Sequence, residues 1–274
     1  MDKLIFNDKD SIFKQIFSIP EYFVDLYKAC SGKTISPQDI TPFSLNAEHI
    51  RRPLTNDVSC LTKDNQLIII VEHQSTPNPN MPQRELLYYA SLLHNWLTQN
   101  DINLSQMGKI NVPLPEFYVA YNGKRSYNQA TMAFGNEFIH IKVKLLEMKQ
   151  EKLHDHSKDN ALTGYVFLYD QFHAKIAEGL SREEAFVYAT DKCLEEGYLK
   201  NIVNKEAFRM TGPLLLTREE DLKWQGYYEG QLDGIEQGIE QEKNQTAQRL
   251  LHRGMAMQDV ADITGLSLEV LREL

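Results

Sequence analysis

Apolar residues recur along the first part of the chain with two different periods, which predict an alternation of helices and strands. Residues 10–29 carry apolar side chains at helical spacing, and Pro20 is expected to begin a second helix within them. Residues 42–62 alternate between apolar and polar side chains, which predicts strands. Residues 66–73 form a nearly continuous apolar run, typical of a strand that is buried on both faces of a sheet.

The pattern continues with a long helix and a further strand before it becomes helical throughout. Residues 82–98 predict a strongly apolar helix, and residues 116–121 predict a short strand. From about residue 158 onward the spacing is helical, with Ser181 as the expected N-cap of a helix and Glu184 at the capping-box position. This order of elements predicts an α/β core in which a mixed sheet is flanked by helices, followed by an all-helical C-terminal region.

We expect three parts in the chain: an α/β core over residues 1–150, a helical region over 151–220, and a C-terminal part over 221–274. The last of these contains a helix-forming segment and then two short helices that resemble a helix-turn-helix module. In the helix-forming segment, glycine recurs at every fourth position, at Gly226, Gly230, Gly234 and Gly238. Glycine costs about 1 kcal/mol in a helix, so two interpretations stay open: a frayed linker helix, or a close contact between helices that makes the protein a homodimer.

Composition narrows the class of protein but does not choose a function. There is no apolar run of the length that a transmembrane helix needs and no signal peptide pattern, so we expect a cytoplasmic protein without a membrane partner. The net charge of −9 argues against binding nucleic acid by bulk electrostatics. Residues 1–130, however, carry 12 Lys/Arg and 13 Asp/Glu, so most of the negative charge lies in the second half.

Residues 55–74 contain the strongest candidate for a functional site, which becomes visible when they are interpreted as a β-hairpin. A turn at Asp64 and Asn65 would pair positions whose numbers sum to 129, which sets Asp57 directly opposite Glu72. Gln74 lies two residues beyond Glu72 and therefore faces the same way. Two adjacent carboxylates repel each other and attract a divalent cation, and such hard oxygen ligands suit Mg²⁺, Mn²⁺ or Ca²⁺. From spacing alone, a solvated hairpin end remains an open alternative.

Several segments together resemble a known family. They span nearly the whole chain: KDSIFKQIF (9–17), NDVSCLT (56–62), IIIVEHQSTPNPNMPQRELLYY (68–89), SREEAFVYATDKCLEEGYL (181–199) and LLHRGMAMQDVADITGLSLEVL (250–271). The chain resembles the recombination-promoting nuclease (Rpn) and putative transposase family of bacteria, within the PD-(D/E)xK nuclease superfamily. The most specific of these segments is the EHQS at 72–75, followed by a proline-bearing loop and a helix with Arg and Tyr.

The resemblance implies a role for individual residues. Asp57 and Glu72 would hold the cation, and Gln74 stands where the superfamily usually has a lysine. The missing positive charge would come from Lys14 or Arg84, although each of these could also be an ordinary ion-paired helix residue. Asp10 matches a family position and would add a carboxylate to the metal site, or else cap a helix.

The resemblance also implies a restriction-endonuclease-like core and a function. We expect a divalent-metal-dependent DNA endonuclease, with Mg²⁺ as the first candidate for the cation, linked to recombination or mobile elements. The alternative is a nuclease-like fold without catalysis that serves as a DNA-binding or oligomeric interaction module. The absent lysine and the acidic second half of the chain favour this alternative.

Overall fold

The computed structural model describes residues 12–43, 56–105, 108–123, 127, 132–200 and 219–273. The chain divides into two compact units, Met1–Arg218 and Glu219–Leu274. The first unit contains the sheet and the helices that cover it, and the described elements of the second unit are all helices. The two units are described separately below.

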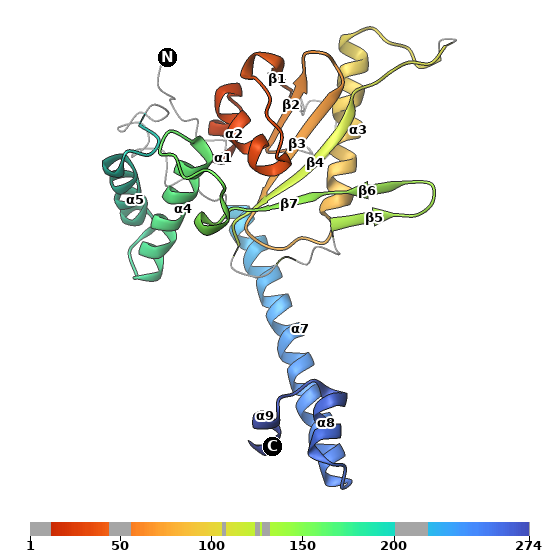
Figure 1. The fold of residues 1–274 in the computed structure, drawn as a ribbon, viewed down its shortest axis with the longest axis vertical. Coiled ribbons are helices and arrows are strands. Elements are labelled where there is room, and N and C mark those ends of the chain that lie inside the picture. Colours follow the sequence, from red (N-terminus) through yellow and green to blue (C-terminus); the bar gives the residue numbers. More distant parts are fainter. Residues whose placement is uncertain are drawn as a thin grey trace. The chain divides into compact units, whose positions relative to one another are not determined.

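A mixed five-stranded sheet forms the centre of the first unit (Figure 1). Its strand order is β1-β2-β3-β4-β7, with β1 (Ile40–Pro42), β2 (Val58–Thr62), β3 (Leu67–Gln74), β4 (Leu114–Tyr121) and β7 (Lys144–Glu147). β1, β2 and β3 pair antiparallel, whereas β3, β4 and β7 pair parallel. The mixed α/β class expected from the sequence is therefore confirmed, with the apolar run of β3 at the centre of the sheet.

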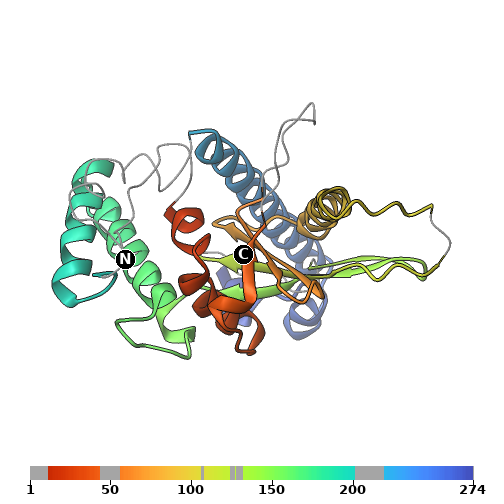
Figure 2. The same ribbon diagram turned by 90° about the horizontal axis from the view of Figure 1, so that it is seen from above.

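Helices cover both faces of this sheet (Figures 1 and 2). One face packs against α1 (Ile12–Phe17) and α2 (Pro20–Ser31), and the other against α3 (Met81–Gln99). Helix α4 (Ala161–Ala177) packs on α2, and α5 (Arg182–Glu196) packs on α4, so both extend the first core. Side chains of β3 alternate between the two cores: Ile69 and Val71 join the first, and Ile68 and Ile70 join the second. Each of these residues is fully buried, which stabilises the fold by about 1.5–3 kcal/mol per side chain.

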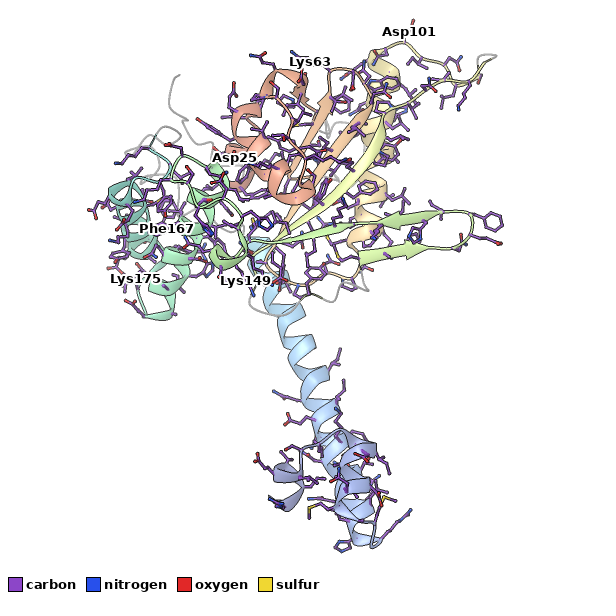
Figure 3. The ribbon with its side chains drawn as sticks, viewed as in Figure 1. Asp25, Lys63, Asp101, Lys149, Phe167 and Lys175 are labelled. Atoms are coloured by element: carbon purple, nitrogen blue, oxygen red, sulfur yellow. The ribbon has the colours of Figure 1, made fainter. Side chains whose placement is uncertain are left out.

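Helices α4 and α5 share a core with the sheet. The Asp25 carboxylate of α2 accepts a hydrogen bond from the Ala161 backbone N–H at 2.8 Å, at the start of α4 (Figure 3). A negative charge there is favourable because the first N–H groups of a helix have no partner within the helix. At α5 the capping box of Ser181 and Glu184 is present, as predicted.

Shorter elements complete the first unit. They are the 3₁₀ helices η1 (Pro37–Asp39) and η4 (Gln150–Lys152) and a separate hairpin of β5 (Ala133–Gly135) and β6 (His140–Lys142). Among the described helices, none is long and apolar enough to cross a membrane.

The second unit consists of α7 (Glu219–His252), α8 (Met257–Thr264) and α9 (Leu268–Glu273). Gly265 ends α8 with φ of 69°, the left-handed conformation expected of the turn between the two short helices. Ala247, Val260 and Leu271 form the small core of this unit. In α7, a Cβ added at Gly230, Gly234 or Gly238 would meet no described atom within 4 Å, so no contact within this chain requires glycine there.

Candidate functional site

The hairpin of β2 and β3 has the register that the sequence predicts. Its paired residues run from Val58 opposite Val71 to Leu61 opposite Ile68, so their numbers sum to 129. The connection is wider than the expected two-residue turn, because β2 ends at Thr62 and β3 begins at Leu67. Asp57 directly precedes β2, and Glu72 follows Val71, the β3 residue that pairs with the first residue of β2.

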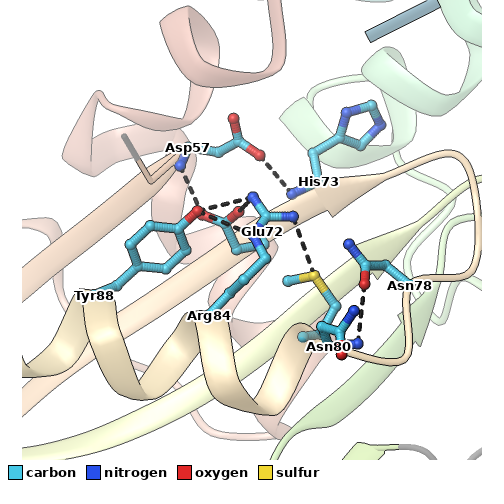
Figure 4. A network of polar contacts seen from close by, with 8 residues as sticks. Asp57, Glu72, His73, Asn78, Asn80, Arg84 and Tyr88 are labelled. Atoms are coloured by element: carbon cyan, nitrogen blue, oxygen red, sulfur yellow. Dashed lines mark hydrogen bonds and ion pairs between the residues drawn. The ribbon is translucent and has the colours of Figure 1, made fainter. Parts of the chain in front are cut away.

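Asp57 and Glu72 are joined by reciprocal contacts between carboxylates and backbone (Figure 4). The Asp57 backbone N–H donates to Glu72 Oε1 at 2.9 Å, and the His73 backbone N–H donates to Asp57 Oδ2 at 2.8 Å. Each carboxylate therefore binds the opposite strand. These hydrogen bonds fix both acidic side chains at one point of the sheet, where β3 and its parallel neighbour β4 also end.

Glu72 is an acidic side chain inside the protein, with 1% of its surface exposed. Burial raises its pKa to about 8, the charge of Asp57 adds to this effect, and the charge of Arg84 opposes it. The Arg84 guanidinium lies 3.0 Å from Glu72 Oε2 and forms an ion pair with it. Arg84, one of the two candidates for the positive charge, therefore contacts the acidic pair.

The guanidinium of Arg84 is held in place from its own helix. Its Nη2 and Nε atoms donate to the Tyr88 hydroxyl at 2.8 and 3.2 Å, one turn further along α3 (Figure 4). Burial is the largest single effect and lowers the pKa of Arg84, but Glu72, Tyr88 and Asp57 together raise it above its usual value. Tyr88 is buried, and its hydroxyl also orients the Arg84 guanidinium.

Glu85 is a functional candidate that the sequence reasoning missed. It is fully buried in α3, and neither of its carboxylate oxygens has a hydrogen-bond partner among the described residues. Burial first, and then the charge of Glu72, raise its pKa well above the ordinary value, with Asp57 acting in the same direction. The sequence does indicate that Glu85 is buried, because Glu85 lies within the apolar stripe of the helix, at helical spacing from Met81, Tyr88 and Leu92.

His73 faces the opposite side of the sheet from Glu72, as the alternation of the strand predicts. Its ring stacks on Phe13 with 4.8 Å between centroids, and its Nε2 atom lies 2.7 Å from the Asn122 Nδ2 atom. Burial lowers the pKa of His73 to about 4, so the ring is neutral at physiological pH. A structural role for its side chain follows from these contacts.

Gln74 ends β3 and stands next to Tyr121 of β4 in the parallel register. Its backbone carbonyl accepts from the Asn122 N–H at 3.1 Å, which ties together the loops that follow the two strands. Gly123 allows this approach, since a Cβ there would overlap the Ser75 carbonyl oxygen and the Tyr121 hydroxyl. By alternation, the Gln74 side chain faces the same side of the sheet as Glu72.

Lys14 and Asp10 are the remaining predicted site residues. Lys14 lies in α1, whose buried residues pack in the core on the other face of the sheet from α3. Asp10 lies outside the described residues. Asp57, Glu72, Gln74 and Arg84 come from three neighbouring segments.

The donor set at this point suits a hard divalent cation. Asp57 and Glu72 would hold it through carboxylate oxygens, and Glu85 brings two further buried oxygens that lack a partner in the described part of the chain. Within the same part of the chain, no three His, Cys, Asp or Glu side chains already stand in a metal-binding arrangement. The side chains would therefore have to turn toward a common point on binding.

Comparisons of the chain with models of protein families, with curated proteins and with solved structures gave no match. The geometry of the site must therefore carry any functional argument.

Proposed function

We propose that this chain is a divalent-cation-dependent deoxyribonuclease of the PD-(D/E)xK type, related to the recombination-promoting nucleases and acting in the cytoplasm. The observation that carries the proposal is the register of β2 and β3 together with the hydrogen bond by which Asp57, directly before β2, contacts the Glu72 carboxylate. Two carboxylates in that position are what a cation-dependent phosphodiesterase requires. Further support comes from Arg84, which brings a positive charge to a site where lysine is absent.

In this proposal each residue has a distinct task. Asp57 and Glu72 hold the cation, for which Mg²⁺ is the first candidate and Mn²⁺ and Ca²⁺ are alternatives. A bound cation of this kind polarises a phosphodiester oxygen and lowers the pKa of a bound water. Gln74 orients that water, or a non-bridging oxygen, through its side-chain amide, because it cannot act as a base. Arg84, fixed by Tyr88, stabilises negative charge on the phosphate.

The test is cleavage of supercoiled plasmid with Mg²⁺, Mn²⁺ or Ca²⁺, each with and without EDTA. Cleavage is expected to need the cation and to be lost in Asp57→Ala and Glu72→Ala. Glu116→Gln is the matched control, because Glu116 lies in the same sheet but beside Ile69 in the register. If the two alanine variants cleave as fast as the parent, this site assignment is wrong.

A second candidate function is the binding of DNA or protein by a nuclease-like fold that does not cleave DNA. It is favoured by the ion pair of Arg84 with Glu72, which already neutralises one of the two carboxylates. It is also favoured by Gln74, which lacks the charge of a lysine. DNA binding without cleavage, across all three cations and both single- and double-stranded substrates, would support this function over the first.

We also propose that the protein is a homodimer through its C-terminal helical region. Gly230, Gly234 and Gly238 of α7 meet no described atom, while Ile235 and Ile239 beside them are 55% and 53% exposed. Light scattering of the full chain should give the mass of two chains, and a chain ending at Arg218, the limit of the first unit, should give the mass of one. A monomeric full chain would rule the dimer out.

A further inference from the structure

Glu85 is a buried acid whose presence the stability of the fold does not explain. Its side chain is 0% exposed, and both of its oxygens lack a hydrogen-bond partner in the described residues. A carboxyl group without a partner in the protein interior costs free energy whether it is charged or neutral. Buried polar groups that remain unsatisfied are rare in proteins and call for a specific explanation.

The position of Glu85 in α3 directs it at the candidate site. It lies between Met81 and Tyr88 on the stripe of the helix that packs against the sheet. Its neighbours Arg84 and Tyr88 meet at the carboxylate of Glu72. The charges of Glu72 and Asp57 both act on Glu85, which shows that the three acids share one electrostatic environment.

Three acids, Asp57, Glu72 and Glu85, lie near Arg84 at this point, and the charge of Arg84 acts on both Glu72 and Glu85. Buried carboxylates are stable when they are paired, protonated or bound to a cation. The oxygens of Glu85 have no hydrogen-bond partner among the described residues, and carboxylate oxygens are the ligands that Mg²⁺ and Mn²⁺ prefer.

We propose that Glu85 is a third carboxylate of the divalent-cation site, acting together with Asp57 and Glu72. This inference rests on the proposed function, because it assigns a further residue to the same site. Asp57 and Glu72 are each held by a backbone hydrogen bond, whereas the Glu85 carboxylate is held by none among the described residues. It can therefore turn toward a cation without breaking a hydrogen bond, while Arg84 keeps its bond to Tyr88.

The experiment measures cation binding directly in the full chain, by calorimetric titration with Mn²⁺ in the absence of DNA. Four proteins are compared: the parent, Glu85→Gln, Glu72→Gln and the control Glu116→Gln. Glu85→Gln is expected to weaken Mn²⁺ binding by about 10- to 100-fold, the range seen when a carboxylate near a metal is removed. Glu116→Gln should bind as the parent does, because Glu116 lies elsewhere in the sheet.

Thermal unfolding in EDTA separates this role from a structural one. A structural acid destabilises the protein when it is replaced, whereas removal of an unpaired buried carboxylate should leave the melting temperature unchanged or raise it. Glu85→Met, which has a similar volume and no hydrogen-bonding demand, serves as the second variant if the glutamine variant does not fold.

The outcomes distinguish this inference from the proposed function. If the parent binds Mn²⁺, Glu72→Gln loses binding and both Glu85 variants bind as the parent does, the role of Glu85 is refuted and the nuclease proposal survives. If binding depends on Glu85 but no DNA is cleaved, the inference stands and the nuclease proposal fails. If the parent binds no Mn²⁺, both are refuted.

Discussion

Replacement of Glu72 by Gln should change how the stability of the cation-free protein depends on pH. The pKa of Glu72 is about 8 in the folded protein and 4.5 in an exposed side chain. Between these values the folded state holds a proton that the unfolded state releases. The stability contributed by Glu72 is therefore complete below about pH 4.5 and is lost as the pH rises toward 8.

The size of the effect follows from the difference between the two pKa values. One proton held by the folded state alone corresponds to a slope of about 1.4 kcal/mol per pH unit. Over the whole window this amounts to about 5 kcal/mol if Glu72 titrates alone. The effect is smaller to the extent that Glu85, whose pKa is also raised, shares the proton with Glu72.

The assay is urea unfolding in EDTA at several pH values between about 5 and 8. The parent should lose stability with rising pH more steeply than Glu72→Gln, so the difference between the two curves is the readout. The control Glu116→Gln should run parallel to the parent, because the pKa of Glu116 is lowered and lies below this window. Parallel curves for the parent and Glu72→Gln would refute the idea that Glu72 is a strained buried acid.

Three further predictions rest on other contacts. A buried neutral histidine makes the protein lose stability as the pH falls from about 6.5 to 4, and His73→Phe should remove this loss in urea unfolding. An unchanged dependence of stability on pH in this range would contradict the lowered pKa of His73. Gly234→Ala and Gly238→Ala should each weaken the proposed dimer in light scattering, although neither added methyl group would meet a described atom of its own chain. An unchanged dimer, with α7 stabilised by about 1 kcal/mol in thermal unfolding, would contradict a close contact at these glycines. Tyr127→Phe should cost about 1–3 kcal/mol and speed hydrogen exchange at Asn78, because the Tyr127 hydroxyl bonds both backbone groups of Asn78; unchanged exchange would contradict this.

The sequence was sufficient to predict the hairpin because its pattern is local. Side chains of a strand alternate between faces, so a shift of one residue would turn the whole buried set of β3 toward the wrong core. Only a register with an odd sum keeps Asp57 on the face of Glu72, and the register with a sum of 129 is the one observed. The pairing of these two acids was thus predictable from short-range pattern alone.

The source of positive charge was not predictable, because it depends on where two helices lie in space. Lys14 and Arg84 were equal candidates along the chain, and each belongs to a helix with a clear apolar stripe. The stripe of α1 packs on one face of the sheet and that of α3 on the other. Because helical periodicity says which side of a helix is buried but not against what, only the tertiary structure could show that Arg84 contacts Glu72.

Glu85 was overlooked for a different reason. A glutamate beside an arginine in an amphipathic helix is usually a solvated residue, and Glu85 follows Arg84 directly. Its place in the stripe with Met81, Tyr88 and Leu92 contradicts that assumption, since positions at spacings of three and four lie on one side of a helix. Local pattern and residue type disagree at this position, and such disagreement is expected at functional rather than structural positions.

A second acid in the same sheet shows that this fold can satisfy a carboxylate. Glu116 of β4 has both oxygens occupied: Tyr27 and Tyr118 donate to Oε2 at 2.9 Å each, and Lys33 donates to Oε1 at 2.6 Å. Its partners lower its pKa, whereas burial raises those of Glu72 and Glu85. The sheet can thus satisfy an acid fully, and the oxygens of Glu85 remain without such partners where β3 ends. The chain therefore holds one carboxylate, Glu116, whose contacts stabilise the fold, and another, Glu85, whose replacement by an apolar side chain should make the fold more stable.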